Sequence, residues 1–163
     1  MANWVIRCSQ DYLIPVVEHM RKELLSRDII HCDETPVQVL KEEGKKPQTK
    51  SYMWLYRTGN DDKSPIVLYD YQPSRNGDHA VTFLKDFKGF VHSDGFSGYN
   101  KLTGITRCGC WAHLRRKFVE AVPGKKAPGA PPTNAESGRD YCDQLFEIER
   151  GLKDLSPEER KVK

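Results

Sequence analysis

The stretch IIHCDETPVQVL, from Ile29 to Leu40, places two carboxylates directly after a short apolar run. β-Branched residues lead into it, which is typical of a buried strand. We expect this strand to run from Asp28 to Cys32 and to be closed by Asp33, because a Thr-Pro break follows. An acid at the end of a strand can belong to a metal site or to an ordinary turn. The choice depends on whether the chain offers a second acid in a matching position.

A second acid occupies the same kind of position further along the chain. The run FVHSDG predicts a short strand from Phe90 to His92 that ends on Asp94. Because adjacent parallel strands bring their ends to one edge of a sheet, we expect Asp33 and Asp94 to lie together. Two carboxylates this close repel each other unless a cation or a proton lies between them. Hard oxygen ligands suit Mg²⁺ or Mn²⁺, so the pair predicts a divalent-metal site, with a turn role for each Asp as the alternative.

Length and composition indicate one globular domain. The chain has 163 residues, of which 30% are charged and 37% are hydrophobic, and this suffices for one core. No apolar run approaches the roughly 20 residues that span a bilayer, and the first residues lack the layout of a secretory signal. The five cysteines show no disulfide framework and are interpreted as reduced thiols. We expect a cytoplasmic protein without a membrane partner.

Positive charge is concentrated in the second half of the chain. Between Lys101 and Lys126 there are seven Lys or Arg residues against one acid, although the whole chain carries only +3. Such a stretch indicates a polyanion partner, with a solvated basic face as the alternative. Arginine forks bind phosphate oxygens of a nucleic-acid backbone, and loop lysines can extend such a surface. The predicted DNA contacts are His113, Arg115, Arg116, Lys117, Lys125 and Lys126.

The hydrophobic periodicity predicts the order helix, three strands, helix, strand, helical turn, strand, helix, loop, helix. We expect Asp78 to cap the second helix, which ends at Gly89, and Trp54 to lie in the core of the sheet. Three antiparallel strands followed by alternating helices and short strands indicate an α/β fold. Its mixed five-stranded sheet would have helices on both faces, the arrangement of the ribonuclease-H-like fold.

The same pattern divides the chain into four segments. Residues 1–27 form a helical lead-in, and residues 28–122 form the ribonuclease-H-like core. Residues 123–137 form a flexible, basic Pro/Gly loop. Residues 138–163 form a C-terminal helix, whose helical pattern runs from Gly138 to Leu155.

Three blocks of the sequence carry a family resemblance. HCDETPVQVL, GFVHSDGFSGYN and CGCWAHLRRKFVEA resemble the DDE-type transposases of bacterial insertion sequences, specifically the insertion-sequence 66 family, from about Ser9 to Arg150. The resemblance implies a ribonuclease-H-like catalytic core with two magnesium ions, which cleaves DNA and transfers strands at transposon ends. It implies that Asp33 is the first catalytic acid and Asp94 the second. It also implies a nucleoid-associated homo-oligomer that binds transposon ends and target DNA.

The third catalytic acid of that family has no counterpart here. In the family it is a Glu within an Asn-Asn-x-x-Glu-Arg block, and no such block occurs before Lys163. Glu147 and Glu149 match a helix that precedes this block in the family. We therefore expect a piece of a longer transposase that binds metal weakly and has little or no nuclease activity as it stands.

Two other functions remain open from the residues. The first is a non-catalytic DNA-binding or assembly module, a transposase remnant that keeps the basic helix and loop. The second is a zinc-stabilised domain built on Cys108, Cys110 and His113, although zinc prefers four ligands in regularly spaced pairs. Glu34 is expected to point away from Asp33, because successive side chains of a strand alternate between its two faces.

Overall fold

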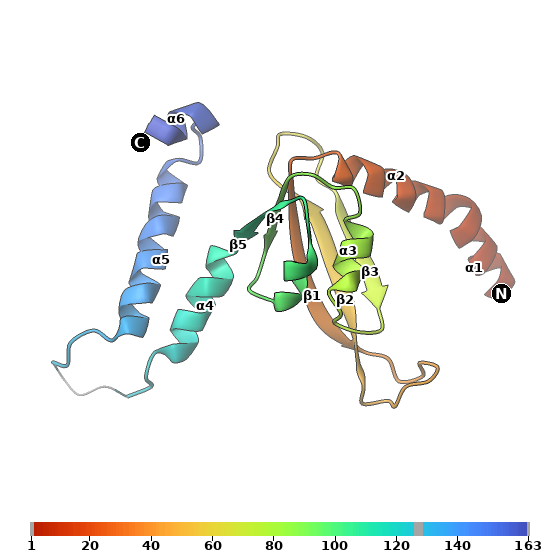
Figure 1. Cartoon of the computed structure of the whole chain (residues 1–163), viewed down its shortest axis with the longest axis horizontal. Helices are drawn as coiled ribbons and strands as arrows, with labels where there is room; N and C mark the ends of the chain where they lie inside the picture. The colour runs from red at the N-terminus through yellow and green to blue at the C-terminus, as the bar shows by residue number, and fades with distance from the viewer. Residues whose placement is uncertain (1, 126–128, 163) are drawn as a thin grey trace. The chain divides into compact units, whose positions relative to one another are not determined.

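The structure, a computed structural model, describes residues 2–125 and 129–162. Lys126, one of the predicted DNA contacts, lies outside the described residues. The chain divides into two compact units, Met1–Gly109 and Cys110–Lys163. The first unit contains the sheet and the second consists of helices (Figure 1).

The first unit is built on a five-stranded sheet with the strand order β3-β2-β1-β4-β5. The strands are β1 (Ile29–Gln38), β2 (Lys50–Thr58), β3 (Val67–Gln72), β4 (Phe90–Ser93) and β5 (Thr106–Gly109). β1, β2 and β3 pair antiparallel, whereas β4 pairs parallel with β1 and with β5. This confirms the predicted α/β fold with a mixed sheet, and it is consistent with a ribonuclease-H-like fold.

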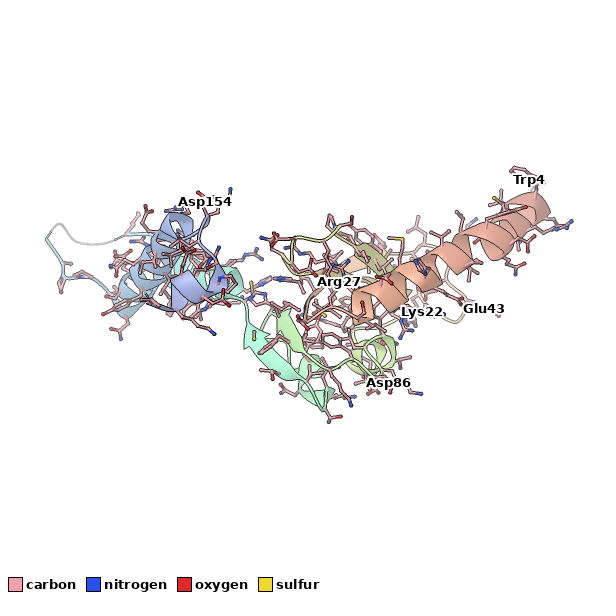
Figure 2. The ribbon with its side chains drawn as sticks, turned by 90° about the horizontal axis from the view of Figure 1, so that it is seen from above. Trp4, Lys22, Arg27, Glu43, Asp86 and Asp154 are labelled. Carbon is pink, nitrogen blue, oxygen red and sulfur yellow. The ribbon has the colours of Figure 1, made fainter. Side chains whose placement is uncertain are left out.

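Helices connect and precede these strands. In the first unit they are α1 (Ala2–Cys8), the π-helical turn η1 (Ser9–Leu13), α2 (Ile14–Leu25), α3 (Asp78–Phe83) and the 3₁₀ turn η2 (Ser97–Lys101). α1, η1 and α2 form one rod, with Trp4 at its far end and Arg27 just beyond its junction with the sheet (Figure 2). In the second unit they are α4 (Trp111–Ala121), α5 (Asn134–Gly151) and α6 (Pro157–Val162). Within the part of the chain that the structure describes, no helix is long and apolar enough to cross a membrane.

The core of the first unit lies on one face of the sheet. Alternate positions of the strands turn apolar side chains toward α2, α3 and η2, as the strand period of two requires. The largest buried side chains are Trp54 and Tyr56 of β2 and Tyr99 of η2. The predicted place of Trp54 in the core is therefore confirmed. The rest of the core is Leu24, Ile30, Cys32, Ile66, Leu68, Ala80, Leu84, Phe87 and Val91.

The predicted end of the first strand is wrong. β1 does not close at Asp33 but continues to Gln38, and it pairs antiparallel with β2 from Ile30 to its end. Its parallel pairing with β4 stops at His31, so the far side of the strand beyond this point has no parallel partner in the register. Pro36 is tolerated there because a proline, which lacks an N–H, can occupy a strand edge. Asp33 consequently lies mid-strand, two residues past the parallel ladder.

Two predicted helix boundaries also differ from the structure. α3 begins at Asp78 itself, with Gly77 at the N-cap position, so Asp78 is not the cap; its carboxylate instead forms an ion pair with Lys101. α3 ends at Phe83, well before the expected stop.

The last helix begins earlier and ends earlier than expected. α5 begins at Asn134 because Thr133 and Glu136 form a reciprocal capping box. It ends at Gly151, and a separate short helix, α6, follows.

Candidate functional site

Each of the two predicted catalytic acids follows the last parallel pair of β1 and β4 by two residues. The last parallel pair between β1 and β4 is His31 with His92. Asp33 follows His31 by two residues, and Asp94 follows His92 by two residues. Both acids therefore lie just past the parallel ladder, Asp33 within β1 and Asp94 directly after β4.

Backbone amides orient both carboxylates. Asp94 Oδ1 accepts a hydrogen bond of 2.9 Å from the N–H of Phe96, which closes a tight turn after β4. Asp33 Oδ1 accepts a hydrogen bond of 2.9 Å from the N–H of Glu34. Both acids are partly buried. These hydrogen bonds fix one oxygen of each carboxylate, which leaves the other oxygen of each for further contacts.

Glu34 lies on the core side of β1. Its side chain has no exposed surface, and Glu34 Oε2 accepts a hydrogen bond of 2.6 Å from the Tyr99 hydroxyl. Because β1 continues as a regular strand, Asp33 belongs to the opposite face, as predicted. Burial raises the pKa of Glu34, and the hydrogen bonds from Tyr99 and Arg75 oppose that shift.

Arg75 joins this buried glutamate to the site. It lies in the loop between β3 and α3, and its Nε and Nη2 lie 2.8 and 2.6 Å from Glu34 Oε1. Arg75 Nη2 also lies 3.9 Å from Asp94 Oδ2, and its guanidinium stacks over the Phe96 ring at 4.1 Å from the centroid. Arg75 was not predicted from the sequence. An arginine in a turn carries no local signal, and its partner lies 41 positions away.

A histidine pair precedes the acids on the sheet. The rings of His31 and His92 meet edge to face with centroids 4.7 Å apart. Burial lowers the pKa of His31 to about 4, and electrostatic interactions with His92 and Arg57 add to this effect. His31 is therefore neutral at pH 7 and adds no positive charge beside the acids.

The donors at this edge are of the type that Mg²⁺ and Mn²⁺ prefer. Asp33 and Asp94 offer carboxylate oxygens, and such ions complete their shells with water and phosphate oxygens. Among residues 2–125 and 129–162, no cluster of three or more His, Cys, Asp or Glu side chains is arranged to hold a metal ion. The described residues thus fit a divalent ion in donor type, with two acids rather than three.

The predicted DNA contacts lie in the second unit and differ in their surroundings. Arg115 of α4 forms a forked ion pair with Asp143 of α5, with Nε–Oδ1 and Nη2–Oδ2 distances of 2.5 and 3.2 Å. Lys117 Nζ lies 2.9 Å from Glu120 Oε2. Arg116 and Lys125 are exposed.

His113, the remaining predicted DNA contact on α4, is partly buried. Arg115 and Lys117 already have acidic partners inside the unit, so a phosphate would have to compete for them. The exposed Arg116 and Lys125 are better placed for such a contact.

Fold and site together define a class of protein. A mixed α/β sheet, with one acid on β1 and another directly after the neighbouring parallel strand β4, is the framework of a domain consistent with the ribonuclease-H-like fold. The model of the family described as "Transposase IS66 family" matches residues 1–163. The chain therefore belongs to the IS66 transposase family.

Curated relatives come from Sinorhizobium fredii (strain NBRC 101917 / NGR234). "Uncharacterized protein y4hP" is 29% identical over 167 residues, which cover 91% of this chain and 30% of the relative. "Uncharacterized protein y4qI" is 30% identical over 136 residues, which cover 74% of this chain and 24% of the relative. The chain thus spans less than a third of the length of these relatives. No solved structure matches the chain.

Proposed function

We propose that this chain is part of the catalytic core of a DNA transposase, in which Asp33 and Asp94 together hold Mg²⁺ or Mn²⁺. The observation that supports the proposal is that each acid follows the last β1–β4 pair, His31 with His92, by two residues. Membership of the IS66 transposase family supports DNA as the substrate. In the full-length protein the reaction would be DNA cleavage and strand transfer, carried out in the cytoplasm by a homo-oligomer on transposon ends and target DNA.

Each residue has a defined part in this proposal. Asp33 and Asp94 supply oxygen ligands, and hydrogen bonds from the N–H groups of Glu34 and Phe96 orient those carboxylates. A divalent ion bound there would activate a water or a 3′ hydroxyl as the nucleophile. It would also stabilise the leaving oxygen in phosphoryl transfer. Arg116 and Lys125 contact the DNA backbone through phosphates. With two acids, this chain is expected to bind metal weakly and to cleave DNA slowly or not at all.

Calorimetric titration with Mn²⁺ tests the proposal. Wild type is expected to bind the ion, and Asp33→Asn and Asp94→Asn each weaken binding by about tenfold or more, because each removes a charged ligand. Asp86→Asn is the matched control: Asp86 is an exposed acid in the left-handed backbone region at φ 68°, which Asn tolerates. Equal binding by wild type and Asp94→Asn would refute the acid site.

The second candidate function is a non-catalytic DNA-binding or assembly module. It would use exposed basic side chains such as Arg116 and Lys125 and would need no metal ion. In that case DNA binding persists while Mn²⁺ binding is absent from the wild type and both variants alike.

A further inference from the structure

We infer that Arg75, anchored by Glu34, is a positioning residue that clamps the Asp94–Phe96 turn against β1. The inference deepens the proposed function, because it rests on Asp94 as a metal ligand. It concerns how the loop between β3 and α3 holds this acid in place without touching the ion itself.

The anchor of the clamp is a fully engaged carboxylate. Both bonds from Arg75, through Nε and Nη2, go to Glu34 Oε1. The other oxygen, Oε2, accepts the Tyr99 hydroxyl. Charge-assisted hydrogen bonds of this kind are short and directional. Glu34 therefore cannot turn away from Arg75 without giving up its bond to Tyr99, and the guanidinium is held at β1.

The other side of the guanidinium holds the turn. It stacks on Phe96, the residue whose N–H orients Asp94 Oδ1. Its Nη2 atom faces Asp94 Oδ2 at 3.9 Å. Arg75 therefore contacts both ends of the turn that presents this acid, and Glu34 connects these contacts to the strand that carries Asp33.

Close backbone packing fixes the loop that carries Arg75. A Cβ atom at Gly77 would lie 2.2 Å from the carbonyl oxygen of Gly98, which is far inside van der Waals contact. The start of α3 is therefore pressed against η2, directly after the Asp94–Phe96 turn. The position of the Arg75 backbone is set by this contact and not by the ion pair alone.

The clamp and a simple neighbouring charge predict opposite effects on metal affinity. A cation 3.9 Å from Asp94 Oδ2 opposes the binding of a second cation by Coulomb repulsion. If Arg75 acts only as a neighbouring charge, its removal would therefore tighten Mn²⁺ binding. If Arg75 acts as a clamp, its removal weakens Mn²⁺ binding, because the free turn must be ordered at the moment of binding.

Mn²⁺ titration of Arg75 variants distinguishes a clamp from a simple neighbouring charge. Arg75→Gln is expected to weaken binding by about tenfold, the usual cost of losing a residue that orients a metal ligand. Arg75→Lys is expected to weaken it as well, since an ammonium keeps the charge but not the fork. Lys85→Gln, which removes an exposed positive charge elsewhere in the unit, is expected to match wild type. Unchanged or tighter binding in Arg75→Gln overturns the clamp.

Hydrogen exchange of the Phe96 amide tests the clamp without metal. In metal-free Arg75→Gln this amide is expected to exchange about tenfold faster than in Lys85→Gln, because local opening becomes easier. Amides of β1 and β2 should keep their protection, which shows that the variant is folded. Unchanged Phe96 exchange refutes the clamp. Equal Mn²⁺ binding by wild type and Asp94→Asn refutes the proposed function instead, and Phe96 exchange still decides on the clamp.

Discussion

At the scale of single residues, Glu34 is a carboxylate in a buried position of the first unit. Its side chain is completely buried, and burial of a carboxylate costs free energy unless charged and polar partners compensate. Arg75 and Tyr99 are those partners. The interior of this unit therefore depends on a small polar network next to the candidate metal ligands.

Removing the Tyr99 hydroxyl should destabilise the protein. Tyr99→Phe leaves Glu34 Oε2 buried without its donor, and loss of such a bond is expected to lower the free energy of unfolding by about 1–3 kcal/mol. Urea denaturation measures the change. Tyr69→Phe is the control, since Tyr69 is 69% exposed and should behave as wild type. Equal stability of both variants would show that the bond contributes nothing.

The ion pair between Arg27 and Asp61 predicts a pH dependence. Arg27 is buried, with Nη1 2.7 Å from Asp61 Oδ2, and the hydrogen bond from Arg27 lowers the pKa of Asp61. The stabilisation is therefore complete above the unfolded pKa of about 3.9 and disappears as the pH falls through the lower folded value.

Asp61→Asn tests this dependence. The variant should be less stable than wild type at neutral pH, and the difference should shrink as the pH drops below about 4, the ordinary range of an Asp carboxyl. Urea denaturation across this range gives the result. Asp62→Asn, at the neighbouring exposed acid, should show no such trend. A difference that stays constant with pH would exclude the ion pair as its cause.

At the scale of elements, the sequence predicts strands more reliably than where they end. The place of Trp54 in the core reflects burial on one face of β2, which is a local property, and it was predicted correctly. The end of β1 depends on the neighbouring strands, because β2 continues alongside it to Gln38 whereas β4 pairs with it only as far as His31. The Thr-Pro pair in the sequence contains no information about either pairing.

In the candidate site, too, local features were predicted from the sequence and features that depend on distant contacts were not. Asp33 and Asp94 were expected together because each follows a short apolar run, and each follows the last β1–β4 pair by two residues. That they share one ion stays a prediction, and the contacts of Arg75 join Asp94 to Glu34. Arg75 was missed because its role arises only when the loop before α3 meets β1, a contact between residues 41 positions apart.

The contact between α3 and η2 predicts a steric effect at Gly77. Its φ of −59° is open to any residue, so Gly77→Ala tests close approach alone. We expect a loss of about 1–3 kcal/mol in unfolding free energy, because a methyl group would overlap the backbone of Gly98. Gly95→Ala is the control, since a Cβ there meets nothing within 4 Å. Urea denaturation that finds both variants equally stable would contradict the packing.

At the scale of the whole molecule, the distribution of charge determines which residues are available to bind DNA. The chain carries only +3, and several basic side chains of the second unit are engaged by acids, as Arg115 is by Asp143. DNA affinity, if carried by phosphate contacts, should fall steeply with salt through counterion release.

The salt dependence of DNA binding measures which residues contact phosphates of the DNA backbone. Arg116→Gln and Lys125→Gln are each expected to reduce the slope of log K against log salt by about 1, as expected for one lost phosphate contact. Lys88→Gln, an exposed lysine of the first unit, should leave the slope unchanged. Fluorescence anisotropy with a duplex oligonucleotide provides the data. Slopes that do not differ among the three variants would remove these residues from the DNA-binding surface.

The central claim is that two aspartates, each two residues past the last β1–β4 pair, share one divalent ion. Paramagnetic broadening by Mn²⁺ in an amide NMR spectrum tests it most directly, because the effect reports distance to the ion. At the first substoichiometric additions the Asp33 and Asp94 amide signals should broaden together, and Asp94→Asn should abolish the effect at both. Broadening that begins at only one of them, or that centres on the exposed acids Asp61 and Asp62, would contradict the account.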